Sequence, residues 1–129
     1  MPNYRKHELL VETYNPEGTI AANRFVSHGT AADGVIAATT ADRDVIGISR
    51  KAAVATDSEI ELVTLGVTML EVNGNSVNIA AGDPLKPTTA GVGVKGATDK
   101  DKCFAIAREA ATADAVLIPV YIAFNDIGV

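Results

Sequence analysis

The sequence repeats itself at a spacing of about 58 residues, and this repetition constrains the fold more than any other feature. At that spacing segment 44–55 aligns with segment 102–113, and the identical positions include Ile48 with Ile106, Arg50 with Arg108 and Ala53 with Ala111. With a one-residue slip, the Ile-Ala-Ala of segment 20–22 also aligns with that of segment 79–81. A unit this short cannot bury the face of a sheet alone, so we expect the two units to fold together.

Each unit alternates short apolar runs with Gly-rich or polar turns, which is typical of the strands of a barrel or sandwich. The clearest strands are expected at 45–48 and 59–65 in the first unit, and at 103–106 and 115–124 in the second. We expect loops or one short helical turn in segments 47–55 and 105–113, because the Gly, Ser, Val and Thr of the first fit a helix poorly. In total the pattern predicts about nine to eleven strands.

The sequence Asn73-Gly74-Asn75 predicts a hairpin that joins segment 67–72 to segment 76–79, because Asn-Gly accepts the positive φ of a tight turn. The expected fold class is therefore all-β: a small barrel or sandwich of two pseudo-repeated units with an extended N-terminal arm. We place the arm at 1–14 and a single β domain at 15–129, with the pseudo-repeats at about 18–66 and 77–124.

The charge balance indicates which partners to expect. The formal net charge is −5, so the chain would repel a phosphate backbone, and we do not expect nucleic acid as a partner. The cluster Arg5-Lys6-His7 is either a solvated tail or a short arm that docks on an acidic neighbour. No apolar run approaches the length of a membrane span, and Cys103 is the single cysteine, so we expect no membrane partner, no intrachain disulfide and synthesis in a reducing cytoplasm.

No residue pattern suggests catalysis or metal binding. The two histidines, His7 and His28, lie in the expected arm and in a turn, and Cys103 stands where the first unit has Val45, as a small buried apolar residue would. The acidic segments 42–44 and 99–101 lack the ligand spacing of a calcium loop and are expected to be polar turns. We therefore expect no enzyme activity, no cofactor and no metal.

One enzyme hypothesis follows from the duplication itself. Duplicated β-proteins can supply one carboxylate from each half to a shared aspartic-protease pair, and Asp33-Gly34 lies in a turn of the first unit. The corresponding segment 88–93 of the second unit contains no Asp, so symmetry cannot assemble the pair. We reject this hypothesis.

Several short motifs resemble those of the capsid cement, or head decoration, proteins of tailed bacteriophages. They are Ile-Ala-Ala-Gly-Asp-Pro-Leu-Lys at 79–86, Gly-Val-Gly-Val at 91–94, Val-Ile-Gly-Ile at 45–48 and Val-Thr-Leu-Gly-Val at 63–67. The similarity covers about residues 15–124, although Cys-Phe-Ala at 103–105 departs from the usual Ile-Gly. The resemblance implies a small β-protein that binds the outside of an expanded phage capsid, often as a homotrimer, and cross-links neighbouring capsid subunits.

Under this resemblance the partners are the major capsid protein and further copies of the chain, and the location is the capsid exterior of a virion assembled in the host cytoplasm. A terminal arm can become ordered on binding, so the expected capsid contacts are Pro2, Asn3, Tyr4, Arg5, Lys6 and His7. The apolar closing strand suggests the oligomer contacts Val116, Ile118, Val120 and Ile122.

Three other functions remain open from the sequence. A β-rich module that recognises glycan or a host surface is the main alternative, although such sites generally use exposed aromatic residues and aromatics make up only 5% of this chain. An enzyme subunit or a tail or baseplate component are further possibilities. A stable oligomer without capsid affinity would favour the glycan-binding alternative.

Overall fold

The computed structural model describes residues 7–39, 45–57, 59–96 and 102–126. These residues form nine strands and one short 3₁₀ helix, η1 (Thr89–Gly91). The strands are β1 (His7–Pro16), β2 (Phe25–His28), β3 (Gly34–Ala37), β4 (Val45–Ser49), β5 (Ile60–Val72), β6 (Pro84–Pro87), β7 (Gly93–Lys95), β8 (Lys102–Ala107) and β9 (Val116–Asp126). No helix in these residues is long and apolar enough to cross a membrane.

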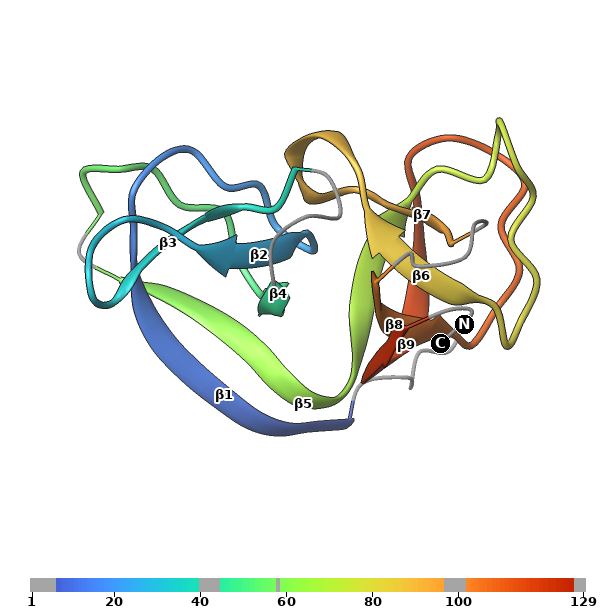
Figure 1. Ribbon diagram of the computed structural model, residues 1–129, viewed down its shortest axis with the longest axis horizontal. Coiled ribbons are helices and arrows are strands. Elements are labelled where there is room, and N and C mark those ends of the chain that lie inside the picture. The colour runs from blue at the N-terminus through green and yellow to red at the C-terminus, as the bar shows by residue number, and fades with distance from the viewer. Residues whose placement is uncertain (1–6, 40–44, 58, 97–101, 127–129) are drawn as a thin grey trace.

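The strands form two small barrels that share strand β5 (Figure 1). Barrel 1 runs in the order β1-β3-β2-β4-β5 and closes where β5 pairs with β1. Barrel 2 runs in the order β5-β7-β6-β8-β9 and closes where β9 pairs with β5. The prediction of an all-β barrel or sandwich is confirmed.

The two barrels repeat the same backbone contacts. Each contains a short parallel contact, β1 with β3 in barrel 1 and β5 with β7 in barrel 2. Isolated antiparallel bridges join Ile20 to Ala53 and Ile79 to Ala111. The N–H of Asn23 donates to the Ser49 carbonyl at 2.9 Å, as the N–H of Gly82 donates to the Ala107 carbonyl at 2.7 Å. The internal repeat is therefore present in the backbone pairing as well as in the sequence.

Strand β5 belongs to both units, which the sequence did not reveal. Its first half is the closing strand of barrel 1, and its second half takes in barrel 2 the place that β1 takes in barrel 1. The halves meet at Gly66, whose φ of +109° disfavours any residue with a Cβ. An added Cβ there would also collide with the carbonyl oxygen of His7. Glycine thus allows one strand to turn from one barrel into the next.

The apolar core consists of two clusters, and the larger of them extends across the junction of the barrels. One cluster fills barrel 1 around Ile20, Val26, Val35, Ile60 and Leu62. A second, larger cluster fills barrel 2 and extends to Phe25 and Ile48 on the outside of barrel 1. There the ring of Phe25 lies edge-on to the ring of Phe104, with centroids 6.4 Å apart. The barrels are therefore packed into one body, and Cys103 is buried in it as predicted.

Two local predictions differ from the structure. Residues 7–14, assigned to the arm, form most of β1, which pairs with β5 along its length, so the first unit begins earlier than residue 18. The predicted hairpin at 73–75 is wrong, because β5 pairs with β9 and the Asn73 side chain accepts a hydrogen bond from the Asn75 N–H in a local turn. The acidic segments 42–44 and 99–101 lie outside the described residues.

Candidate interaction surface

Of the expected capsid-contact residues, Pro2, Asn3, Tyr4, Arg5 and Lys6 lie outside the described part of the chain. His7 is the first residue of β1 and is exposed. It pairs with Val67 on β5, next to the bend at Gly66. The first described residue of the chain therefore lies beside the junction of the two barrels.

The expected oligomer contacts on β9 are inside the protein. Ile118, Val120 and Ile122 are 1%, 0% and 6% exposed, and Val116 packs partly against the same core. Ile118, Val120 and Ile122 are therefore not available to a second subunit, and the prediction is corrected for these three residues. Side chains along a strand alternate between its faces. Of the residues that alternate with these three, Leu117 and Tyr121 are exposed, whereas Pro119 is buried.

The exposed apolar side chains gather on three neighbouring strands. In the described residues seven large apolar side chains are exposed, and two of them, Val54 and Val77, lie in loops. The other five lie on β1, β5 and β9: Leu9, Leu10, Leu65, Leu117 and Tyr121. We call these five residues the apolar strip.

Strand pairing fixes how the strip is arranged. His7, Val67 and Tyr121 are cross-strand partners on β1, β5 and β9, so their side chains project from one face of the sheet. Leu10 and Leu65 form another cross-strand pair beyond the bend. Leu9 is an extra residue in a β-bulge between the Glu8–Gly66 and Leu10–Leu65 pairs and has no partner on β5.

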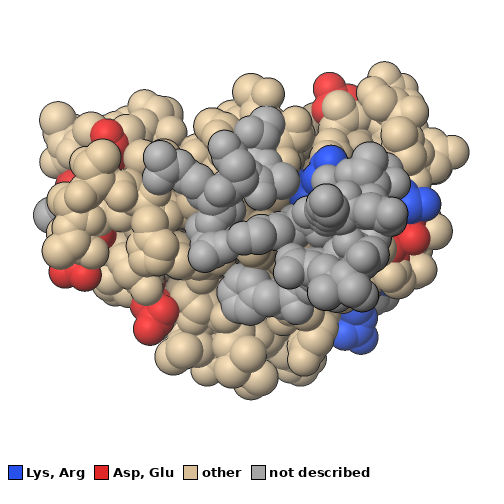
Figure 2. Space-filling view, in the orientation of Figure 1, with Lys and Arg blue, Asp and Glu red and all other residues tan. Residues whose placement is uncertain are grey.

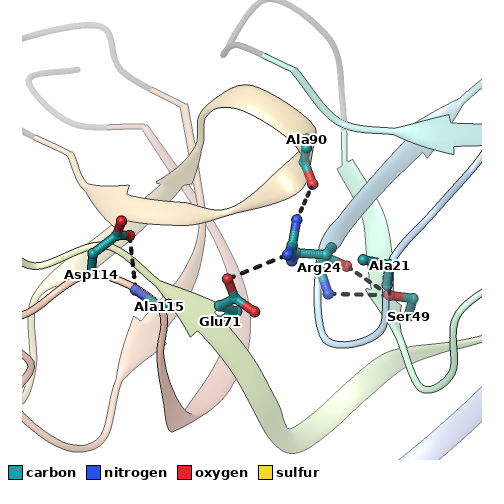
Figure 3. Close-up of polar contacts among 7 residues, drawn as sticks. All are labelled: Ala21, Arg24, Ser49, Glu71, Ala90, Asp114 and Ala115. Carbon is teal, nitrogen blue, oxygen red and sulfur yellow. Dashed lines mark hydrogen bonds and ion pairs between the residues drawn. The ribbon is translucent and has the colours of Figure 1, made fainter.

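Polar contacts of Arg24 and Glu71 link the two barrels (Figure 3). The guanidinium of Arg24 donates to the Glu71 carboxylate at 3.3 Å and to the Ala90 carbonyl at 3.1 Å. The N–H of Glu71 donates to the Asn23 carbonyl at 2.8 Å. Arg24 belongs to barrel 1, whereas Glu71 and Ala90 belong to barrel 2, so these contacts fix the angle between the barrels.

A second polar contact organises a loop of barrel 1. The Glu17 carboxylate accepts hydrogen bonds from the N–H groups of Thr30 and Ala31, at 2.9 and 2.7 Å, and from the Thr30 hydroxyl. These bonds favour the ionised carboxylate, so the pKa of Glu17 is lowered, chiefly by the N–H of Thr30. Burial, with a hydrogen bond to Glu12, raises the pKa of Tyr14. Both groups stabilise the fold locally and suggest no reaction.

The described surface offers little for small-ligand chemistry. No group of three or more His, Cys, Asp or Glu in the described residues could hold a metal ion. A shallow, open hollow is lined by Lys51, Ala52, Glu59, Ile60 and Glu61, but Arg50 pairs with the Glu61 carboxylate at 2.8 Å. On the face shown in Figure 2, charged side chains are scattered over the described atoms and form no broad patch of one sign.

Sequence reasoning missed the strip and the Arg24 contacts for different reasons. The run Leu9-Leu10-Val11 is too short and too closely flanked by charges to stand out as a strand. The Arg24–Glu71 pair joins residues 47 positions apart, and no local sequence pattern predicts it. The repeat itself was the signal that could have revealed β1. The unit that forms barrel 2 begins with a strand, the second half of β5, so the unit that forms barrel 1 should begin with a strand as well.

No protein-family model matches the sequence, and no curated protein matches it. Among solved structures, the N base of the head fiber protein gp8.5 of bacteriophage phi29 is similar, with a TM-score of 0.69 and 18% sequence identity. The similarity covers 92% of this chain and 97% of that one. The chain is therefore similar in fold, over most of its length, to the base of a phage head fiber.

Proposed function

We propose that this protein is a structural component of a phage virion that binds the outside of the capsid and cross-links neighbouring capsid subunits. The observation that carries the proposal is the agreement between two independent likenesses. The sequence motifs resemble capsid cement proteins, and the fold is similar over almost its whole length to a phage head fiber base. Each likeness points to the head of a bacteriophage.

The architecture suits a protein that carries load rather than one that performs a reaction. A cross-linker must keep its contact points at fixed separations, and here a shared strand, an apolar cluster that spans the junction and the Arg24 contacts join the barrels. Under this proposal the protein is not an enzyme and needs no cofactor. Its partners are the major capsid protein and further copies of itself, with a homotrimer as the proposed assembly.

The proposed capsid contacts are Pro2 to His7, because this segment carries the basic cluster and its last residue, His7, lies beside the junction of the barrels. A single short segment binds weakly, but several such segments in one assembly bind with greatly increased effective affinity. The proposed location is therefore the exterior of the capsid, in a virion that is assembled in the host cytoplasm.

Cosedimentation of the purified protein with expanded, decoration-free phage capsids tests this proposal. We expect saturable binding at a fixed ratio per capsid subunit, and at least tenfold weaker binding after Arg5→Glu with Lys6→Glu, because electrostatic attraction to an acidic surface would be reversed. The matched control is Lys51→Glu, a charge reversal at an exposed position outside the strands. Absence of wild-type binding would overturn the capsid role, and a glycan-binding screen would follow.

A further inference from the structure

Each barrel carries one row of cross-strand partners on its outside, and partners across neighbouring strands project from the same face of a sheet. Row 1, in barrel 1, crosses β2, β4, β5 and β1 through successive pairs: Phe25, Ile48, Val63 and Val11. Row 2, in barrel 2, crosses the corresponding strands β6, β8, β9 and β5: Pro84, Ile106, Tyr121 and Val67. Residues that alternate with them, such as Val26, Leu62 and Leu85, fill the barrels, so both rows face outward.

Row 1 is covered by barrel 2. Phe25, Ile48 and Val63 are 0%, 1% and 0% exposed, although they lie on the outside of barrel 1. They belong to the same apolar cluster as Leu70 and Phe104 of barrel 2. The outer row of one barrel is therefore a surface against which this chain packs another barrel of the same repeat.

Row 2 has the same apolar character but is less covered. Tyr121, which corresponds to the fully buried Val63, is 46% exposed. Pro84, Ile106 and Val67 are each only partly buried. Barrel 2 thus presents to its surroundings the kind of row that barrel 1 buries inside the molecule.

The positions beside the two rows differ in polarity. Barrel 1 has Glu61 beside row 1, and Glu59 two residues before it. Barrel 2 has Pro119 and Leu117 at the corresponding positions of the repeat, and Leu117 is 47% exposed. The fold accepts charged residues at these positions, as barrel 1 shows, so the apolar residues of barrel 2 are not required by the barrel itself.

Together these residues form one apolar surface. We call it the barrel 2 face, and it consists of row 2 with the cross-strand partners Met69 and Pro119 and with Leu117. An apolar surface of several neighbouring side chains marks an interaction site. Because none of its residues is charged, two copies of the face can meet without bringing like charges together, as a contact between symmetry-related copies requires.

We propose that copies of the chain pack against one another through the barrel 2 face, which turns toward the symmetry axis that the copies share. The inference rests on the proposed function, because it names the contact between the copies of the proposed homotrimer. The occupant it assigns is the one that row 1 already has within the chain, a barrel of the same repeat. It uses the side of β9 opposite to the buried residues Ile118, Val120 and Ile122.

The size of the face sets the strength of the contact. From the usual strand spacing and rise, it extends roughly 14 Å across the four strands and roughly 13 Å along β9. This is smaller than the roughly 800 Å² per partner of a standard interface. The association of free chains is therefore concentration-dependent, and binding to a capsid, which holds several copies close together, strengthens it.

Multi-angle light scattering of the free protein over a concentration series tests the contact. The average mass of the wild type should rise to at least twice that of Tyr121→Glu, because the variant places a charge within the face. Tyr121→Phe keeps the aromatic ring and should associate as the wild type does. The matched control is Val54→Glu, which places the same charge at a position of similar exposure, 44%, in a loop of barrel 1 and should also associate.

Two results would overturn the proposal. One is a folded Tyr121→Glu, checked by circular dichroism and urea unfolding, that associates as strongly as the wild type. The other is a wild type that stays at the mass of a single chain at every concentration. If Tyr121→Glu does not fold, Leu117→Glu takes its place, because Leu117 is equally exposed and lies at the other end of the face along β9.

Cosedimentation with capsids separates this contact from the proposed function. Association that Tyr121→Glu abolishes, in a wild type that binds no capsid, would support the contact and overturn only the capsid role. Capsid binding by a wild type that never associates in solution would support the capsid role and overturn the contact. Loss of capsid binding in Tyr121→Glu with unchanged mass would assign the face to the capsid protein, and would also overturn the contact between copies.

Discussion

At the scale of single residues, three glycines separate the effect of a positive φ from the effect of missing space for a Cβ. Gly66 has a positive φ and no room for a Cβ, Gly82 has a positive φ and open space, and Gly18 has open space without a positive φ. We expect the alanine variants to lower the free energy of unfolding by about 3 kcal/mol at Gly66, by about 1 kcal/mol at Gly82, and by less than about 0.5 kcal/mol at Gly18. Urea unfolding of the three variants measures the series. Equal losses at Gly66 and Gly82 would show that the contact with β1 contributes nothing.

Glu17 gives the fold a pH dependence whose sign follows from its hydrogen bonds. Because the pKa of Glu17 is lower in the folded chain than its ordinary value of 4.5, its stabilising effect is present above that value and is lost as pH falls through the folded-state pKa. Glu17→Gln should therefore be less stable than wild type at pH 7, and the difference should shrink towards pH 3. Urea midpoints at the two pH values measure this. Glu59→Gln is the matched control, and a difference independent of pH would contradict the prediction.

At the scale of elements, the contact between the barrels depends on Arg24. Arg24→Met keeps the aliphatic part of the side chain but leaves the partly buried Glu71 carboxylate without its guanidinium, so we expect a loss of about 1 to 2 kcal/mol in the free energy of unfolding. Lys95→Met removes the more exposed Lys95–Asp83 pair and should cost less than about 1 kcal/mol. Chemical denaturation compares the two. Equal losses would mean that the Arg24 pair behaves as an ordinary surface ion pair.

The strands show what local patterns could and could not predict. Strands β4 and β8 and the repeat spacing were readable, because apolar runs between turns recur at matching positions. The sequence could not show which side chains of β9 are buried. Its residues are nearly all apolar, so no alternation of apolar and polar residues distinguishes the inner face of the strand from the outer one. Strand β1 was read as an arm because its partner, β5, is about 50 residues away in sequence and only tertiary pairing makes it a strand.

The surface contacts were harder to predict than the fold. Burial is decided by which face of a strand meets the core, and for β1 and β9 this depends on how the chain closes each barrel. The apolar strip could be recognised only after the pairing of β1, β5 and β9 was known. The basic cluster at the N-terminus was visible in the sequence, and its role as a capsid contact stays a prediction.

At the scale of the whole molecule, the shared strand should make the two barrels unfold together. Leu85→Ala creates a cavity in barrel 2 and should lower the stability of the entire protein by about 2 to 5 kcal/mol rather than melt one barrel first. Differential scanning calorimetry should show a single transition with equal calorimetric and van't Hoff enthalpies for wild type and variant. Two resolved transitions would mean that the barrels are separate folding units.

The shared strand also affects how such a protein can evolve. An ordinary tandem duplication can be reversed, since deleting one copy leaves the other intact. Here the last strand of the first copy and the first strand of the second are one element, β5. A deletion of either copy therefore removes a strand from the barrel that remains. The ancestral duplication is therefore irreversible by simple loss. The two halves are free to diverge in sequence and in loop length, but they are inherited as a single piece.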